Sequence, residues 1–320
     1  MKPNHILILG AGVSGLSTGI LLLQAGYEVT IWAQELPPNT TSNKAGAFWY
    51  PYHRNRNDRF TGWARATIGY LGESGMLDDP MSGCVTKTMT ELLDHPKGKP
   101  WWSDAVGTYR RPRAQEIPPG YVDGYQIEAP LMDTALYMGY ILEKFQQLGG
   151  DLVKKAVQDM GEALEDHPVV INCTGLGSRE LVNDQRVYPI RGQTVRIKPN
   201  GFNQVVFDDE GPNKVAIIVP RTHDTILGTT WQKDDWNTAI DPEDTKDILR
   251  RCANLNPAFE HVEIIGEAVG LRPARDQIRL EAKDVSGKTL IHNYGHGGSG
   301  FTLSWGCALE VVELVHKSFK

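Results

Sequence analysis

Glycines near the N-terminus have the spacing of a turn that binds dinucleotides. They follow an apolar, strand-like run at 6–9, open a helical pattern that ends at Gly26, and lead to a second buried run at 29–32. In such a unit the first glycine permits a tight turn, the second lets the backbone approach a pyrophosphate, and the third lets helix and strand pack closely. Free N–H groups and the helix dipole favour the phosphates. The alternative is a glycine-rich turn without a ligand. The predicted contacts are Gly10, Gly12, Val13, Ser14 and Gly15.

An acidic residue normally ends the second strand of this unit and holds the cofactor ribose. Here Ala33 and Gln34 stand at that place, and Glu35 lies 20 residues beyond Gly15. Glu35 is either the ribose ligand or an ordinary solvated charge, and both interpretations stay open. The turn by itself does not distinguish NAD from FAD.

A second glycine cluster, at 295–300, lies between a predicted strand at 289–294 and a predicted helix at 302–317. Its glycines would form a concave backbone at the start of the helix, which stabilises negative charge. The alternative is a helix entry turn, for which one glycine would suffice. His292 and His296 are four residues apart, but the segment is not helical. We therefore expect packed or hydrogen-bonded histidines and no metal site.

Arg272 lies in an apolar, strand-like run that ends at Pro273. An arginine in such a run needs a partner, because a buried guanidinium without one is costly. A substrate carboxylate is one candidate, since the planar fork can hold it with two parallel hydrogen bonds. An internal ion pair with Asp or Glu is the other. The residues alone do not decide between them.

Composition sets the broad class of the protein. The chain has 320 residues, 40% of them hydrophobic, so two lobes are expected rather than one core. The formal net charge is -6, which gives no reason to expect a nucleic acid or an anionic membrane as partner. The four cysteines lack metal-ligand spacing and are predicted to be buried free thiols of a cytosolic enzyme.

The apolar stretch at 6–26 superficially resembles a targeting or membrane segment. Its glycines divide it into a strand-like and a helix-like half, and neither half is long enough to cross a bilayer. The C-terminal residues 317–320 do not form a peroxisomal signal. The protein is therefore predicted to be cytoplasmic.

Hydrophobic periodicity predicts further elements along the chain. Buried or alternating runs indicate strands, and three-to-four spacing of apolar residues indicates helices. The predicted helices lie at 133–148 and 242–254, and the predicted strands at 85–89, 125–128, 169–175, 187–197, 203–207, 215–219 and 225–231.

Four sequence blocks together resemble one family of enzymes. They are Ala45–Tyr52 (AGAFWYPY), Ile171–Gly175 (INCTG), Gly270–Pro273 (GLRP) and His292–Thr302 (HNYGHGGSGFT). In this order and content they are similar to the D-amino-acid oxidase family, which includes the D-aspartate oxidases. The matching blocks extend from residue 5 to about residue 315, which is nearly the whole chain.

The resemblance implies an α/β fold with non-covalently bound FAD. A Rossmann-like FAD-binding domain, built from residues 1–50, 151–186 and 268–320, would be interleaved with a substrate domain on a mostly antiparallel sheet. That second domain would comprise residues 51–150 and 187–267. The concave glycine backbone would stabilise negative charge on the reduced flavin. Gln34, where the family often has Asp, leaves the adenosine-end contacts open. The cofactor contacts that the motifs and the resemblance predict are Gly10, Gly12, Val13, Ser14, Gly15, Gln34, Glu35, Thr40, Thr41, Gly46, Val157, Thr174, Gly175, Arg272, Gly297, Gly298, Gly300, Phe301 and Thr302.

The resemblance also assigns the substrate site. Arg272 stands where the family binds the substrate α-carboxylate. Ile217 replaces a family tyrosine whose hydroxyl helps to hold that carboxylate, and Trp231 stands where D-aspartate oxidases have an arginine. Tyr50 or Tyr52 could supply the missing hydroxyl, or could pack in the core. The predicted substrate contacts are Arg272, Gly298, Tyr50, Tyr52, Ile217 and Trp231.

These features imply oxidative deamination of neutral, apolar or aromatic D-amino acids. The α-carbon would give a hydride to the flavin without a catalytic side-chain base, and dioxygen would be reduced to hydrogen peroxide. The imino acid would hydrolyse to a 2-oxo acid and ammonia. Residues 176–179 and 232–237 look closer to D-aspartate oxidase, so acidic D-amino acids stay open. Further alternatives are a flavin dehydrogenase with another acceptor, an NAD-dependent dehydrogenase and a non-catalytic nucleotide-binding protein. A homodimer is compatible with all of these.

Overall fold

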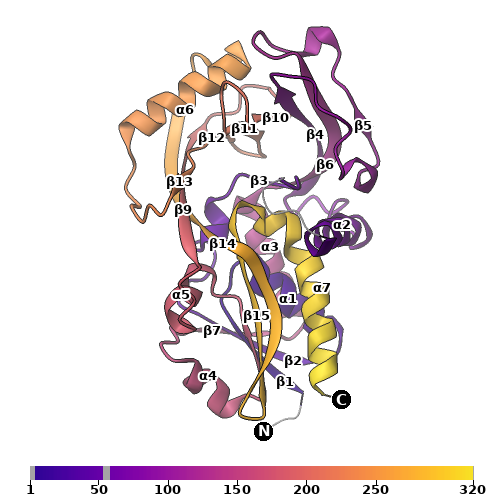
Figure 1. Cartoon of the computed structure of the whole chain (residues 1–320), viewed down its shortest axis with the longest axis vertical. Coiled ribbons are helices and arrows are strands. Elements are labelled where there is room, and N and C mark those ends of the chain that lie inside the picture. Colours follow the sequence, from indigo (N-terminus) through magenta and orange to yellow (C-terminus); the bar gives the residue numbers. More distant parts are fainter. Residues whose placement is uncertain (1–3, 53–57, 320) are drawn as a thin grey trace.

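A computed structural model of the chain describes residues 4–52 and 58–319 (Figure 1). Fifteen of the described strands form one continuous sheet. The strand order along its main path is β3-β6-β4-β10-β11-β12-β9-β14-β15-β8-β1-β2-β7. One end of this sheet is parallel and the other is mostly antiparallel, and the two parts form the two lobes of the molecule.

The parallel part contains the N-terminal strand-helix-strand unit. Residues 6–9 pair with 29–32 on one side and with 169–172 on the other. All three runs are mostly apolar, as expected for strands whose two faces are both covered by helices. The strands of this part are β1 (His5–Leu9), β2 (Glu28–Ala33), β7 (Asp151–Lys154), β8 (Val169–Asn172) and β15 (Lys288–His296).

Helices pack in two layers against this parallel part. α1 (Val13–Gln24) lies against α3 (Thr134–Gln147) and α7 (Gly300–Ser318) on one face. α4 (Met160–Asp166) lies on the other face, where its apolar residues join the core around Leu7 and Leu9. The short α5 (Ser178–Leu181) follows β8.

Helix α2 (Asp58–Glu73) was not predicted from the sequence. Its buried face, which includes Phe60, Trp63 and Leu71, packs against α7. The approach is close, because a Cβ on Gly306 would lie 2.1 Å from the Trp63 carbonyl oxygen. Both α2 and α3 come from the stretch 51–150, which the sequence assigned to the substrate domain. Their packing against α1 and α7 places these helices beside the parallel part of the sheet (Figure 1).

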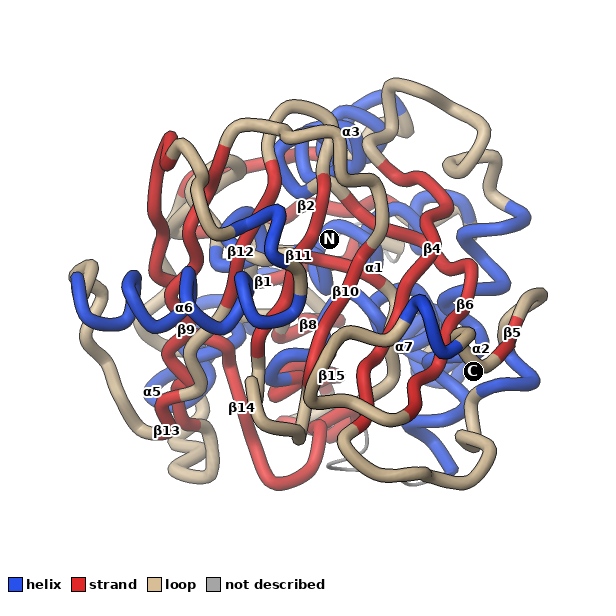
Figure 2. The backbone as a smooth tube through the Cα atoms, turned by 90° about the horizontal axis from the view of Figure 1, so that it is seen from above, coloured by secondary structure: helices blue, strands red, loops and turns tan. Residues whose placement is uncertain are grey.

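The antiparallel part forms the second lobe, and helix α6 (Pro242–Leu255) crosses its strands β9, β11 and β12 (Figure 2). An apolar core between this helix and the sheet includes Val195, Ile218, Leu227 and Ile248. The strands of this lobe are β3 (Ala47–Phe48), β4 (Cys84–Leu93), β5 (Tyr109–Arg110), β6 (Asp123–Met132), β9 (Tyr188–Ile197), β10 (Val205–Asp208), β11 (Ala216–Pro220), β12 (Thr225–Gly228) and β13 (Gln232–Lys233).

Strand β14 (Ile264–Val285) connects the two lobes (Figure 1). Its first half pairs with β9 of the second lobe, and its second half pairs with β15 of the first. The pairing with β15 shifts register between Ala274 and Arg279. Arg272 therefore lies at the junction of the lobes, close to the glycine cluster that ends β15.

Short 3-10 turns complete the chain, and several of them border the junction of the lobes. They lie at Thr41–Lys44, Ser103–Ala105, Ala114–Glu116, Gly175–Gly177, Pro257–Phe259 and Gly297–Ser299. Within the described ranges, no helix combines the length and the apolar character that crossing a lipid bilayer would require.

Candidate active site

A cavity of about 550 Å³ extends from the N-terminal glycine turn to the junction of the two lobes. Segments far apart in the sequence line it, because the sheet brings their ends to one place. The lining includes residues 9–14, 32–35, 39–42, 44–48, 155–157, 173–177, 207–209, 293–294 and 296–298, together with single residues of β9, β11 and β14.

The first glycine turn has the shape that a close-lying ligand needs. Gly10 has φ +104°, and a Cβ there would lie 2.6 Å from the carbonyl oxygen of Cys173. Gly12 begins α1 without a capping side chain of its own. Ser42, which the sequence did not predict as a site residue, accepts a hydrogen bond from the Val13 N–H at 3.0 Å and also lines the cavity.

The second glycine cluster lies on the cavity wall and turns from β15 into α7. Gly297 has φ +57°, and a Cβ on Gly298 would lie 3.6 Å from the Trp231 ring and 3.7 Å from the Arg272 Cδ. His296, buried beside these glycines, also lines the cavity. Burial lowers the pKa of His296 to about 4, so its ring is neutral near pH 7. Its Nε2 has no hydrogen-bond partner among the described residues, and a ligand in the cavity could supply one.

The predicted cofactor contacts gather on this cavity with two exceptions. Gly15 packs α1 against the turn, since a Cβ there would lie 1.9 Å from the Gly10 oxygen. The Thr302 side chain is buried and bonds to the backbone of Tyr50. The predicted cofactor contacts that line the cavity are Gly10, Gly12, Val13, Ser14, Gln34, Glu35, Thr40, Thr41, Gly46, Val157, Thr174, Gly175, Arg272, Gly297, Gly298, Gly300 and Phe301.

Arg272 reaches the cavity without an acidic partner. Its Nη2 donates to Thr229 Oγ1 at 2.9 Å and its Nη1 to the carbonyl oxygen of Thr230 at 3.2 Å. The guanidinium carbon lies 5.2 Å from the centre of the Trp231 ring. Within the described part of the chain, no ion pair to this guanidinium is present. Neutral protein oxygens therefore hold Arg272, and N–H donors remain for an anionic ligand.

The electrostatics at Arg272 agree with this position. Burial lowers its pKa to about 10, and the nearby Tyr52 hydroxyl works in the opposite direction. The group stays charged near pH 7, and a bound carboxylate would offset its desolvation. The sequence did not predict Thr229 and Thr230 as the partners of Arg272, because the pairing joins residues more than forty positions apart.

The predicted tyrosines have different places. Tyr52 lines the cavity, and burial together with the nearby Asp209 carboxylate raises its pKa, while Arg272 lowers it. Tyr50 lies outside the cavity, where its buried hydroxyl donates a short hydrogen bond to Glu91. This placement does not support a direct substrate contact for Tyr50.

An apolar wall stands beside Tyr52. Phe48 and Phe207 line the cavity there, with ring centres 5.4 Å apart. Ile217, at the place of the family tyrosine, also lines the cavity and lies against Gly46 and Gly228.

His292 is buried in β15, and burial lowers its pKa to about 4. Among the described residues no cluster suits a metal ion.

Comparison with known proteins identifies the family. The pattern of the FAD dependent oxidoreductase family matches residues 5–314. The chain belongs to this FAD dependent oxidoreductase family. It is 47% identical over 319 residues to the D-amino-acid oxidase of Dictyostelium discoideum, with 97% of this chain and 91% of that protein covered. It is 32% identical over 336 residues to human D-aspartate oxidase, with 98% and 95% covered.

The fold of the family is also found in solved structures. Glycine oxidase from Geobacillus kaustophilus has a TM-score of 0.79 at 18% identity, with 98% of this chain and 95% of that chain covered. Membership of the family identifies the protein as a flavoenzyme whose cofactor is FAD. The N-terminal glycine turn alone does not distinguish FAD from NAD. The glycine turn, the orphaned His296 nitrogen and the second glycine cluster all fit a long dinucleotide in this cavity.

Proposed function

We propose that the protein oxidises D-amino acids and passes the electrons to dioxygen. The observation that carries this proposal is the Arg272 guanidinium, which faces the FAD cavity and is held by neutral oxygens rather than by a protein carboxylate. A substrate α-carboxylate would satisfy its remaining N–H donors with two parallel hydrogen bonds. The products would be a 2-oxo acid, ammonia and hydrogen peroxide.

The residues around Arg272 would orient the substrate. Arg272 would hold the carboxylate, and Gly298, which has no side chain, would let the α-carbon approach the second glycine cluster. The phenol of Tyr52 has a raised pKa, so it stays protonated near pH 7 and can donate a hydrogen bond. FAD, when bound, supplies the two-electron acceptor for the oxidation. The contribution of the chain would thus be position and charge rather than a side-chain base.

The lining of the substrate end supports neutral side chains. Phe48, Phe207 and Ile217 offer an apolar and aromatic surface. Asp209 lines the same cavity close enough to Tyr52 to raise its pKa, and a carboxylate on the substrate side chain would be repelled by it. Trp231, where a D-aspartate oxidase would have arginine, supplies no cation. We therefore place D-alanine and D-phenylalanine above D-aspartate as substrates, with D-aspartate as the second candidate.

A substrate panel in air-saturated buffer tests this function. The FAD-loaded enzyme is given D-alanine, D-phenylalanine, D-aspartate and L-alanine, and both peroxide and 2-oxo acid are measured. We expect equal amounts of the two products from the neutral D-amino acids and none from L-alanine. Faster turnover of D-aspartate would make the second candidate correct. Dye reduction without peroxide would identify a dehydrogenase with another acceptor.

The proposal leaves two predictions about the protein in the cell. The sequence predicts a cytoplasmic location and is compatible with a homodimer, and cell fractionation and sedimentation equilibrium would test the two proposals.

A further inference from the structure

Arg191 lies next to the substrate end of the cavity but on the opposite face of β9. Its neighbour Gly192 faces the Arg272 guanidinium, because a Cβ on Gly192 would lie 2.3 Å from Nη1. Since successive residues of a strand point to opposite faces, Arg191 points toward α6 instead. Its side chain is only 2% exposed. Nothing in the reaction proposed above requires this buried cation.

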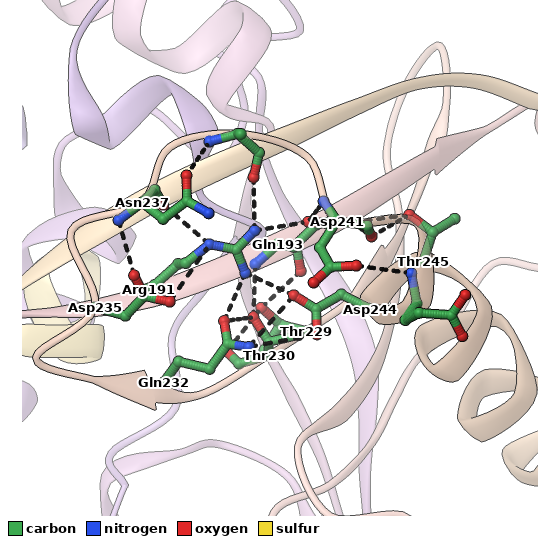
Figure 3. Close-up of polar contacts among 12 residues, drawn as sticks. Arg191, Gln193, Thr229, Thr230, Gln232, Asp235, Asn237, Asp241, Asp244 and Thr245 are labelled. Atoms are coloured by element: carbon green, nitrogen blue, oxygen red, sulfur yellow. Dashed lines mark hydrogen bonds and ion pairs between the residues drawn. The ribbon is translucent and has the colours of Figure 1, made fainter.

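All of the N–H groups of Arg191 are matched by acceptors (Figure 3). Five N–H donors face five acceptors, so the guanidinium is fully satisfied. Among the described residues, Asp244 of α6 is the only carboxylate hydrogen-bonded to Arg191, at 2.7 Å, and the Asp235 carboxylate lies 4.0 Å from Nε. The acceptors are the Asn237 and Ala239 carbonyl oxygens, the Gln232 and Gln193 side-chain oxygens, and Asp244 Oδ2. They belong to β9, to the segment 232–239 and to α6, so Arg191 ties three segments together.

This network continues to the residues that hold Arg272. Gln232 Oε1, which accepts from Arg191, also accepts from Thr230 Oγ1 at 3.3 Å. The Gln193 backbone N–H donates to Thr230 Oγ1 at 3.0 Å, and its carbonyl oxygen accepts from Thr229 Oγ1 at 3.0 Å. Thr229 and Thr230 are thus fastened to the backbone of β9 at Gln193, and the Thr230 hydroxyl also reaches the Arg191 network through Gln232.

The position of Arg272 depends on that segment. In the part of the chain that the structure describes, both of its hydrogen bonds end on Thr229 and Thr230, and the ring that it stacks on is Trp231. A guanidinium held by a carboxylate would keep its place through a strong charge-assisted pair, but Arg272 has only neutral acceptors. A shift of Thr229–Trp231 would therefore move the Arg272 guanidinium, which receives the substrate carboxylate.

We propose that Arg191, held by Asp244, is a positioning residue that sets the orientation of the Arg272 guanidinium through Gln232 and the Thr229–Trp231 segment. The inference rests on the proposed function, in which Arg272 binds the substrate carboxylate. Arg191 touches neither substrate nor cofactor. Lysine would not replace it, because an ammonium has three donors where the site has five acceptors.

The test compares two aspartates that each pair with an arginine. Asp244→Ala removes the charged acceptor of Arg191. Asp123→Ala is the matched control, because Asp123 pairs with Arg111 at 2.6 Å, has the same 18% side-chain exposure and lies outside the cavity lining. The probe is benzoate, a flat carboxylate that has no amine and cannot be oxidised as a substrate. Its Kd for the FAD-loaded proteins is measured by calorimetry, and their Tm values are measured in parallel.

We expect a rise in benzoate Kd, of about tenfold, in Asp244→Ala and no rise in Asp123→Ala. The loss of Tm should be larger in Asp244→Ala, because the side chain of Arg191 is only 2% exposed whereas that of Arg111 is 35% exposed. KM for D-alanine should rise with it, more than kcat falls. Arg191→Lys should repeat the effect, and it provides the measurement should Asp244→Ala yield too little folded protein. In an Arg272→Lys background the Asp244→Ala change should alter Kd by less than about twofold, because coupled positions are not additive.

Three results would overturn the inference but leave the proposed function intact. The first is an unchanged benzoate Kd in Asp244→Ala while Arg272→Lys binds benzoate more weakly than the wild type. The others are an equal rise in benzoate Kd in Asp123→Ala, or a full tenfold rise when Asp244→Ala is made in the Arg272→Lys background. If Arg272→Lys itself bound benzoate like the wild type, the proposed role of Arg272 would be wrong, and the inference would fall with it.

Discussion

Gly192 of β9 leaves the space that the guanidinium of Arg272 occupies. A Cβ at Gly192 would lie 2.3 Å from Nη1 and 2.5 Å from Nη2 of that arginine. Gly192 pairs with Gly270 of β14, two residues before Arg272, so the strands are joined by two glycines at this point. The position of the Arg272 guanidinium therefore depends on a residue that has no side chain.

Gly192→Ala should weaken carboxylate binding without loss of FAD. The new methyl group must displace the guanidinium, so we expect benzoate Kd to rise by about tenfold or more. Flavin absorbance of the purified protein should stay at the wild-type level. Gly69→Ala is the control, because Gly69 is exposed on α2 and a Cβ there meets nothing within 4 Å. An unchanged Kd in Gly192→Ala would mean that Arg272 does not hold the carboxylate in this position.

The pH dependence of benzoate binding should identify the titrating cation. The pKa of Arg272 is lowered only to about 10, so the wild type should bind benzoate with constant affinity from pH 7 to 9. In Arg272→Lys the same burial acts on a group whose ordinary pKa is about two units lower. Its affinity should therefore fall within this range as pH rises and the ammonium is lost. Parallel pH profiles for the two proteins would contradict this assignment.

Glu91→Gln should stabilise the protein at neutral and higher pH. Burial raises the pKa of Glu91 to about 7, above its ordinary value near 4.5, so the folded protein holds the proton more tightly than the unfolded chain. As pH rises from 4.5 through 7, the free energy of unfolding of the wild type should therefore fall relative to that of Glu91→Gln, by up to about 3 kcal/mol. Urea unfolding at pH 5 and pH 8 measures the difference.

Tyr50→Phe provides a check on the Glu91 assignment. The Tyr50 hydroxyl donates to Glu91 and lowers the pKa of that carboxyl against the larger effect of burial. Its removal should raise the pKa further and shift the midpoint of the stability change to higher pH. A stability difference between Glu91→Gln and wild type that does not vary with pH would show that Glu91 does not titrate in this range.

Much of the fold was predictable because local patterns agree with the tertiary structure. The runs at 6–9, 29–32 and 169–172 form adjacent parallel strands, and the helices predicted at 133–148 and 242–254 form with small changes at their ends. Helix α2 was missed because the many Pro, Gly, Arg and Trp residues of its surroundings suggested short strands. Its amphipathic face becomes apparent only beside α7.

The site was predictable where one residue type carries the chemistry. The predicted glycines other than Gly15 line the cavity, together with Arg272, Tyr52, Ile217 and Trp231. The supporting residues were not predictable, because Thr229, Thr230 and Gly192 act through contacts across the sheet that leave no local signal. Tyr50 and Tyr52 are equivalent in the sequence, and only the fold directs one to Glu91 and the other to the cavity.

The most direct measurement is kcat/KM of Arg272→Ala for D-alanine, with the flavin spectrum confirming bound FAD. Loss of a charge-assisted pair to the substrate carboxylate, and of its orientation, should lower kcat/KM by about a thousandfold or more. A variant that binds FAD and keeps kcat/KM near the wild-type value would contradict the central role of Arg272.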